Sequence, residues 1–78
     1  MKTLIEYIAK SLVDHPEEVQ VKEIRRGNSV NLILRVAKDD MGRVIGKSGR
    51  VANAVRVLLR VAAARSGVRA TLDVEEPR

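Results

Sequence analysis

Two glycines that flank a lysine and a serine form the feature that most restricts what this chain can fold into and bind. Residues 44–50 read VIGKSGR, with two aliphatic residues before the glycine loop and a long segment of helical periodicity after it. Glycines at both ends of a short loop let the backbone approach a phosphate or sugar without a Cβ in the way. The N–H groups that begin the following helix would point to the same place. The loop therefore predicts a polyanion-binding site at the junction of two helices.

The length and composition describe one small folded domain. A chain of 78 residues buries only about 60% of its unfolded surface, so its core is modest and a second domain does not fit. The sequence is 45% hydrophobic and 32% charged, which is typical of a globular chain. Cysteine is absent, which excludes disulfides and thiolate metal sites. We expect residues 1–78 to form a single domain with its core at about residues 3–75.

Neither a secretion signal nor a membrane span is expected. Glu6 and Lys10 interrupt the apolar run at the start of the chain before it reaches the length that a signal peptide needs. No other run approaches the roughly 18 apolar residues of a spanning helix. The expected location is the cytoplasm, with no membrane partner.

Positive charge is concentrated around the glycine loop. The net charge is +5, and residues 41–65 contain six cations and no acid. Eight of the ten acids lie outside residues 30–72, where only Asp39 and Asp40 are found. A solvated basic face is the ordinary explanation of such a pattern. A basic segment that begins at a glycine loop favours a polyanionic ligand instead.

The N-terminal segment predicts an amphipathic helix. Thr3 and Glu6 have the spacing of a capping box, and the helix should continue as far as Asp14, because Pro16 disfavours helical backbone in the residue before it. Tyr7, the only aromatic residue, is expected in or near the core. The apolar residues that recur at helical intervals are Leu4, Ile5, Ile8, Ala9 and Leu12.

A β-hairpin is expected next. Residues 19–24 and 30–36 alternate between apolar and other side chains on either side of the turn residues 26–29. The alternation of the first stretch slips once at Ile24, which suggests a β-bulge.

The second half predicts a short helix, the glycine loop, a long helix and a last strand. Asp39 or Asp40 can cap a helical turn over residues 41–45. Residues 50–66 are helical by period, and Gly67 is a natural stop. Residues 68–74 alternate as a strand. The stripe of the long helix that is expected to face the sheet consists of Val51, Val55, Leu58, Leu59 and Ala62.

These elements predict an α+β fold. If the last strand returns through the two helices to lie beside the second strand, the crossover should be right-handed and the two strands parallel. The result is a three-stranded mixed sheet with the helices packed on one face.

This order of elements and the VIGKSGR loop together resemble a K homology (KH) domain in its type II arrangement, α-β-β-α-α-β. More narrowly, the chain is similar to the small single-KH proteins of bacteria, the KhpA type, over about residues 3–75. The resemblance implies binding of single-stranded RNA, with about four nucleotides held across the G-x-x-G loop. It also implies a role as an RNA chaperone or post-transcriptional regulator. Ala52 stands where KH domains usually carry a larger aliphatic residue.

The resemblance also implies which residues contact RNA. Val44 and Ile45 would help to form an apolar floor under the bases. Arg43, Arg50 and Arg56 would add positive charge. Contacts to the sugar-phosphate backbone would come from Gly46, Lys47, Ser48 and Gly49.

The aromatic content agrees with this mode of binding. RRM and OB-type proteins stack bases on exposed aromatic rings. A chain with one tyrosine and neither phenylalanine nor tryptophan cannot bind RNA in that way.

Other functions fit the same residues less well. Residues 42–48 read GRVIGKS, but a nucleotide-hydrolysing phosphate loop needs four residues between its first glycine and the GK pair, and only three are present. Asp39 and Asp40 are adjacent and suit caps better than an acid/base pair, so we expect no enzyme, metal or cofactor. A helix-turn-helix DNA-binding protein would have residues 41–45 as a very short first helix. A module that binds no nucleic acid is the remaining alternative.

A further apolar line lies on another side of the long helix. Its residues are Ala54, Val57, Val61 and Ala64. Since the sheet covers only one side of the helix, this line would leave an apolar strip exposed on a very small domain. We expect a protein interface there, in a homodimer or in a heterodimer with a KH protein of the KhpB (Jag-like) type, as the resemblance implies. Scattered surface valines are the alternative.

Overall fold

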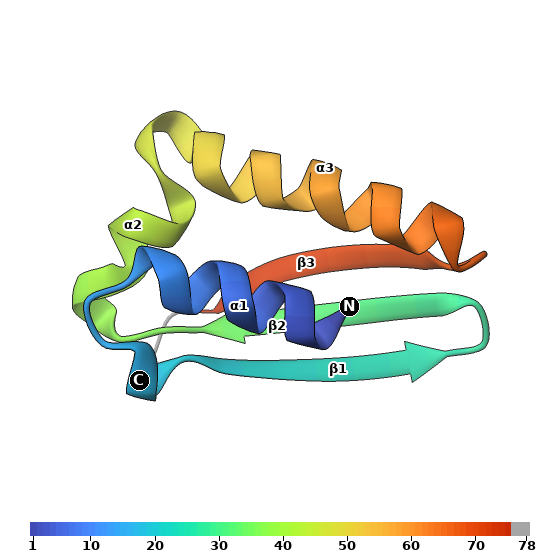
Figure 1. Cartoon of the computed structure of the whole chain (residues 1–78), viewed down its shortest axis with the longest axis horizontal. Helices are drawn as coiled ribbons and strands as arrows, with labels where there is room; N and C mark the ends of the chain where they lie inside the picture. The colour runs from blue at the N-terminus through green and yellow to red at the C-terminus, as the bar shows by residue number, and fades with distance from the viewer. Residues whose placement is uncertain (76–78) are drawn as a thin grey trace.

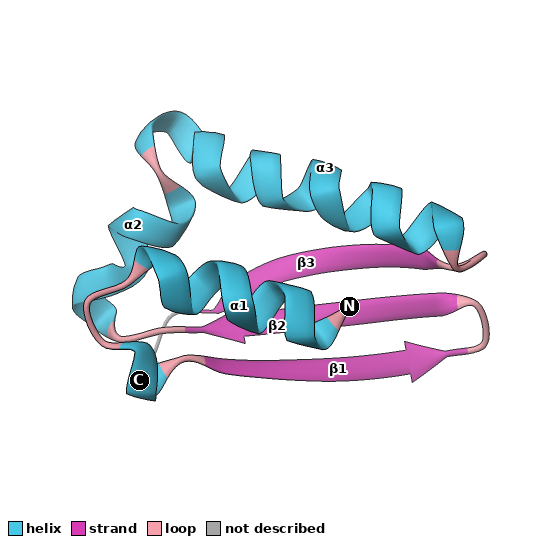
Figure 2. Cartoon of the chain, viewed as in Figure 1, coloured by secondary structure: helices cyan, strands magenta, loops and turns pink. Residues whose placement is uncertain are grey.

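One face of a three-stranded sheet carries the helices of this chain (Figure 1, Figure 2). The structure is a computed structural model that describes residues 1–75, and residues 76–78 of the predicted domain lie outside the described residues. Three short 3-10 turns connect the main elements. In chain order, these elements are α1 (Lys2–Leu12), β1 (Gln20–Arg26), β2 (Ser29–Arg35), α2 (Met41–Ile45), α3 (Arg50–Arg65) and β3 (Arg69–Glu75).

The sheet has the order β1-β2-β3, with β2 in the centre. Strands β1 and β2 are antiparallel across a tight turn in which Gly27 has a φ of +56°. Strands β2 and β3 are parallel, so the chain crosses over through α2 and α3 between them. The α+β class and the three-stranded mixed sheet of a type II KH domain are therefore confirmed.

The predicted bulge in the first strand is wrong. Pairing between β1 and β2 is continuous from Gln20↔Arg35 to Arg26↔Ser29. In a regular strand Val21 and Ile24 must point to opposite faces. Val21 is buried under the helices, and Ile24 lies on the outer face of the sheet, 37% exposed.

Helix α1 covers the sheet with Ile5 and Ala9, which are both buried. It begins one residue before Thr3, and its N-terminus has no side-chain cap, so the predicted capping box is wrong. The helix also ends at Leu12 rather than Asp14. Tyr7 is 73% exposed, because it follows Ile5 by about 200° around the helix and therefore points away from the sheet. The expectation that Tyr7 is near the core is also wrong.

Helix α3 packs over β3 with a rotation that differs from the predicted one. Leu58, assigned to the sheet-facing stripe, is 54% exposed, whereas Ala52 is buried. In this rotation the side chain of Arg56 donates a hydrogen bond to the Leu72 carbonyl oxygen of β3. The buried residues of this helix are Ala52, Val55, Leu59 and Ala63.

The core lies between the sheet and the helices. Its largest fully buried apolar side chains come from α1, β2 and its C-terminal end, and α3, and they are Ile5, Val30, Leu32, Val36 and Leu59. Because β2 is the central strand, its alternate residues contribute most of this core, as their period-2 pattern predicts.

Candidate nucleic-acid interface

The glycine loop forms a single tight turn between α2 and α3. The N–H of Gly49 donates to the carbonyl oxygen of Gly46 at 3.1 Å, which closes the turn. Gly46 has φ +75° and ψ 172°, and Gly49 has φ +75° and ψ 14°. Ser48 also has positive φ, at +56°. Three of the four loop residues therefore adopt backbone conformations that side chains disfavour.

The two glycines are required for different reasons. A Cβ built on Gly46 would lie 2.5 Å from Val51 Cγ2 and 2.8 Å from the Val51 backbone nitrogen. A Cβ on Gly49 would meet nothing closer than Asn53 Nδ2, at 3.8 Å. Gly46 is needed because the first turn of α3 packs against it. Gly49 is needed for its left-handed backbone only.

The tip of the loop presents polar groups to solvent. Lys47, Ser48 and the neighbouring Arg50 are exposed. Gly49 occupies the N-cap position of α3, and no side chain caps this 16-residue helix. The first N–H groups of α3 thus have no side-chain acceptor, and they carry the positive end of the helix dipole. A lysine, a serine hydroxyl and this positive helix end together suit an anionic group.

The aliphatic pair before the loop is divided between core and surface. Val44 is 3% exposed and belongs to the hydrophobic core, so it supports the loop from below. Ile45 is half-buried and lies nearer the surface. Ala52 is buried and lines a small apolar cavity between α1 and α3. The size of the side chain at position 52 therefore affects how these two helices pack.

Arg56 connects α3 to the edge of the sheet. Its Nε donates to the carbonyl oxygen of Leu72 at 3.1 Å, and its Nη1 donates to Asn53 Oδ1 at 3.2 Å. Strand β3 is an edge strand, so no strand lies on its outer side to donate a hydrogen bond to this carbonyl. A shallow pocket of about 160 Å³ follows the junction of α3 and β3, with Arg56 and Arg60 on its rim.

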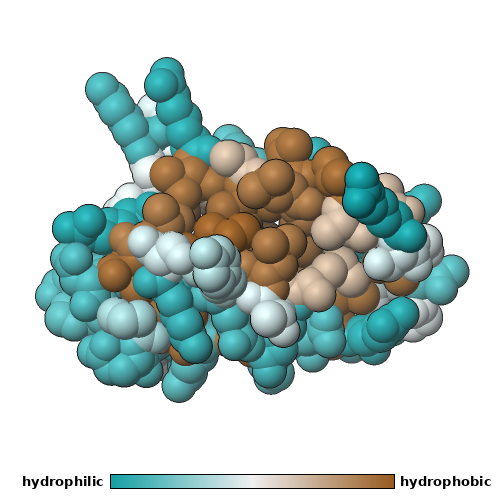
Figure 3. Space-filling view, in the orientation of Figure 1, coloured by the Kyte–Doolittle hydropathy of each residue, from teal (hydrophilic) through white to brown (hydrophobic). Residues whose placement is uncertain are grey.

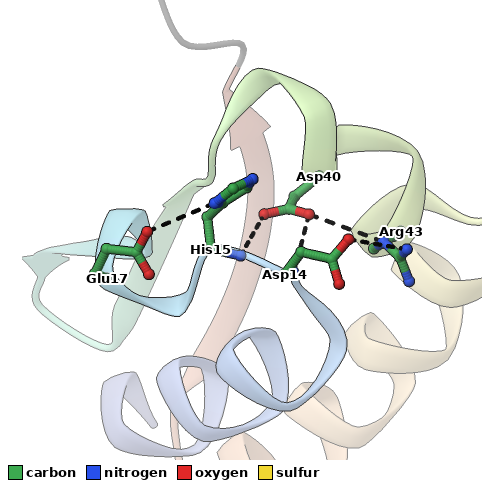
Figure 4. A network of polar contacts seen from close by, with 5 residues as sticks. All are labelled: Asp14, His15, Glu17, Asp40 and Arg43. Carbon is green, nitrogen blue, oxygen red and sulfur yellow. Dashed lines mark hydrogen bonds and ion pairs between the residues drawn. The ribbon is translucent and has the colours of Figure 1, made fainter.

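Arg43 lies in a different environment, among acidic groups (Figure 4). Its Nη2 is 3.0 Å from Asp14 Oδ2, and its Nε is 3.9 Å from Asp40 Oδ1. The charge of Arg43 is therefore largely offset by two carboxylates. Of the six cations in residues 41–65, it is the only one in an ion pair among residues 1–75.

Asp40 joins α2 to the end of α1. Its side chain is buried, and its two carboxylate oxygens each accept a backbone N–H at 3.0 Å, from Asp14 and from His15 (Figure 4). It makes no capping bond to α2, so the predicted capping role of Asp40 is wrong. The residue instead satisfies two donors of the loop after α1, which holds the helix that precedes the glycine loop in place.

One group in residues 1–75 has the spacing of a metal site. The ligand atoms of His15, Glu17 and Glu18 lie within 4.8 Å of one another. The two glutamates are exposed at a 3-10 turn, where acidic residues are common without an ion. The His15 Nδ1 to Glu17 Oε1 distance is 3.6 Å, so the two side chains already face each other.

Helix α3 exposes large apolar side chains to solvent. Val57 and Val61 on α3 are each 55% exposed, and Leu58 beside them is 54% exposed. Figure 3 shows hydrophobic surface over α3 and between α3 and α1.

In the part of the chain that the structure describes, no helix has the length and hydrophobicity to cross a membrane.

Two helices joined by a G-x-x-G turn, set against a three-stranded mixed sheet in this order, define a type II KH domain. A family model described as "KhpA/KhpB, KH domain" matches residues 2–74, and the chain belongs to this family.

Curated relatives agree with this assignment. The "RNA-binding protein KhpA" of Clostridium acetobutylicum is 50% identical over 95% of this chain and 99% of its own length. The protein of the same name from Halalkalibacterium halodurans is 50% identical over 95% of this chain and 97% of its length. That of Chlamydia muridarum is 46% identical over the full length of both chains. These relatives are named as RNA-binding proteins and not as enzymes, as expected for this chain.

Proposed function

We propose that the protein binds single-stranded RNA and holds about four nucleotides across the G-x-x-G loop. The observation that carries the proposal is the loop itself. Lys47 and Ser48 are exposed between two glycines, at the uncapped N-terminus of a long helix. The naming of the curated relatives as RNA-binding proteins supports RNA as the polyanion.

Each residue of the site has a distinct role in this proposal. Gly46 and Gly49 let a sugar-phosphate backbone approach, and Lys47 and Ser48 contact its phosphates. Ile45 forms the apolar floor under the bases, with Val44 beneath it. Arg50 and Arg56 add charge beside the loop and along α3. Arg43 contributes least, because Asp14 and Asp40 already offset its charge.

The proposed role in the cell follows from binding alone. A protein that holds single-stranded segments keeps them from pairing with one another and from reaching other partners. We propose that it works in the cytoplasm in this way, as an RNA chaperone or post-transcriptional regulator.

Competition between nucleic acids tests the proposal against a helix-turn-helix function. A labelled single-stranded oligoribonucleotide should be displaced by unlabelled single-stranded RNA and not by duplex DNA of equal length. Because four nucleotides offer about three phosphates, the slope of log K against log salt for a tetranucleotide should be about −2. Displacement by duplex DNA alone, or a slope near zero, would contradict RNA binding at a basic loop.

The exposed apolar line of α3 is proposed as a protein interface. Ala54, Val57, Val61 and Ala64 all lie on the surface of α3, and Leu58 extends the line. An apolar strip of this extent is unusual on a monomer of 78 residues. The partner is a second copy of the chain or a KH protein of the KhpB (Jag-like) type, with which the matching family model shares its name.

Charging this line should separate the protomers. Val61→Asp is expected to give a folded monomer, since a buried unpaired carboxylate strongly opposes association. Sedimentation at high micromolar concentration measures the change. Tyr7→Asp is the control, because it charges a more exposed side chain on α1 and should leave the assembly intact. A wild-type protein that is monomeric and retains no KH partner would refute the interface.

A further inference from the structure

The outer face of the sheet, which no helix covers, carries two arginines in one row. Arg26 pairs with Ser29 across β1 and β2, and Ser29 pairs with Arg69 across β2 and β3. Directly opposed residues point to the same face. Since Val30 next to Ser29 points into the core, this row points outward. Adjacent strands lie about 4.8 Å apart, so the backbones of the two arginines are about 10 Å apart, with a serine between them.

An open pocket of about 400 Å³ lies over this row. Its lining includes Arg26, Ser29 and Arg69 from this row, together with Ile24, Asn31 and Thr71. The pocket thus combines two guanidinium groups and two hydroxyls with the apolar side chain of Ile24. This is a suitable site for a phosphate and the sugar or base attached to it.

Both arginines are available to a ligand. Within residues 1–75, neither Arg26 nor Arg69 takes part in a salt bridge. The nearest acid on the outer face of β3 is Asp73, four residues and about 13 Å along the strand, where it accepts a hydrogen bond from Asn31. The hairpin end of this face is therefore positive, whereas Arg35 pairs with Glu75 at the other end.

A continuous path connects this pocket to the junction of α3 and β3. A groove of about 350 Å³ shares Arg60 and Thr71 with the pocket beside Arg56, and it shares Arg69 and Thr71 with the outer pocket. The path therefore passes Arg56, Arg60, Arg69 and Arg26 in turn. The path starts on α3, the helix that follows the glycine loop, and ends at the hairpin between β1 and β2. The hairpin lies at the end of the molecule opposite the glycine loop (Figure 1).

We propose that the outer pocket is a second phosphate-binding site for the same RNA strand. A strand that occupies the glycine loop continues along the junction of α3 and β3, turns round the end of β3 and places a phosphate between Arg26 and Arg69. This inference rests on the proposed function. It adds that the protein binds more than the four nucleotides of the loop, and that longer single strands bind more tightly than tetranucleotides.

The test compares short and long RNA on one double variant. Arg26→Ala/Arg69→Ala should weaken binding of a labelled 12-nucleotide oligouridine about tenfold, since hydrogen bonds between charged groups are among the stronger ones. Binding of a tetranucleotide should change less than about twofold. With the 12-mer, the salt slope should become shallower by about 0.7 for each phosphate that the variant no longer binds. Arg26→Lys/Arg69→Lys should retain most of the affinity, because both charges remain.

The matched control is Lys22→Ala/Arg25→Ala, which removes two charges from the same strand outside the pocket. Melting by circular dichroism verifies that each variant is folded. Equal losses of 12-mer affinity in the control and test variants would mean that RNA is attracted only by the overall positive charge. An unchanged 12-mer affinity in the test variant would mean that Arg26 and Arg69 do not contact RNA. Either result overturns the second site while RNA binding at the loop still stands. If the wild-type protein bound neither the tetranucleotide nor the 12-mer, the proposed function itself would be refuted.

Discussion

Replacing Lys47 and Ser48 with aspartate is expected to abolish RNA binding and leave the fold intact. The two carboxylates would lie where a phosphate is proposed to bind. At about 4 Å and an effective dielectric of about 20, each repulsion is of the order of 4 kcal/mol before salt screening. The loss of affinity should therefore exceed about a hundredfold.

The fold should tolerate this change for three reasons. Both side chains are exposed and pack against nothing in the core. Ser48 has a φ of +56°, a region that aspartate enters more readily than most residues. An acid near the N-terminus of α3 interacts favourably with the helix dipole. The melting temperature should therefore stay within a few degrees of that of the wild type.

The chain provides a matched control for this pair. Lys10 and Ser11 are also an exposed lysine and serine in sequence, but they lie on α1. Lys10→Asp/Ser11→Asp makes the same change of charge, so its RNA affinity separates a local effect from the change in net charge. Fluorescence anisotropy with a short RNA and a circular dichroism melt are the two measurements. Unchanged affinity in the folded loop variant would remove the loop from the site.

Gly46→Ala is expected to destabilise the protein much more than Gly49→Ala. Alanine at position 46 would adopt backbone angles that only glycine adopts readily, at a cost of about 1–3 kcal/mol. Its Cβ would also displace Val51 and the start of α3, for about another 1–3 kcal/mol. At position 49 the left-handed backbone alone costs about 1–2 kcal/mol, and the nearest contact is an ordinary one.

Thermal melts measure this difference directly. In a domain of this size about 1 kcal/mol shifts the melting temperature by about 4–8 °C, so the combined cost of about 2–6 kcal/mol for Gly46→Ala should lower it by about 10–45 °C. Gly49→Ala should lower it by about 5–15 °C on the same scale. Equal shifts for the two variants would mean that the contact with Val51 does not restrict position 46.

Sequence patterns predicted the elements of this fold because each is a local property of the chain. The alternation in β2 reflects a central strand whose residues point alternately into the core and out of it. The stop at Gly67 and the glycine loop are likewise determined by nearby backbone geometry. The positive φ of Gly46 and Gly49 agrees with their predicted place at the ends of a tight turn. Their roles in RNA binding, and those of the neighbouring residues, stay predictions.

Three of the wrong expectations concern places where a contact distant in sequence decides the outcome. Ile24 suggested a bulge, but pairing with β2 keeps the strand regular and turns the residue outward. Leu58 fitted a helical stripe, but α3 packs on β3 in a rotation that buries Ala52 and brings Arg56 to the Leu72 carbonyl oxygen. Asp40 had the position of a cap, but it accepts donors from residues 25 and 26 positions away.

The sequence by itself determined the element order, the hairpin and the glycine turn, because hydrophobic period and glycine positions act over a few residues. The parallel crossover followed from that order of elements. Only the tertiary structure decided which side of α3 packs against β3. It also decided that Arg43 forms an ion pair with Asp14, and that strand register aligns Arg26 and Arg69 in one row. The reason is that helix rotation and strand register depend on the summed packing of the whole sheet. No local pattern in the chain records that sum.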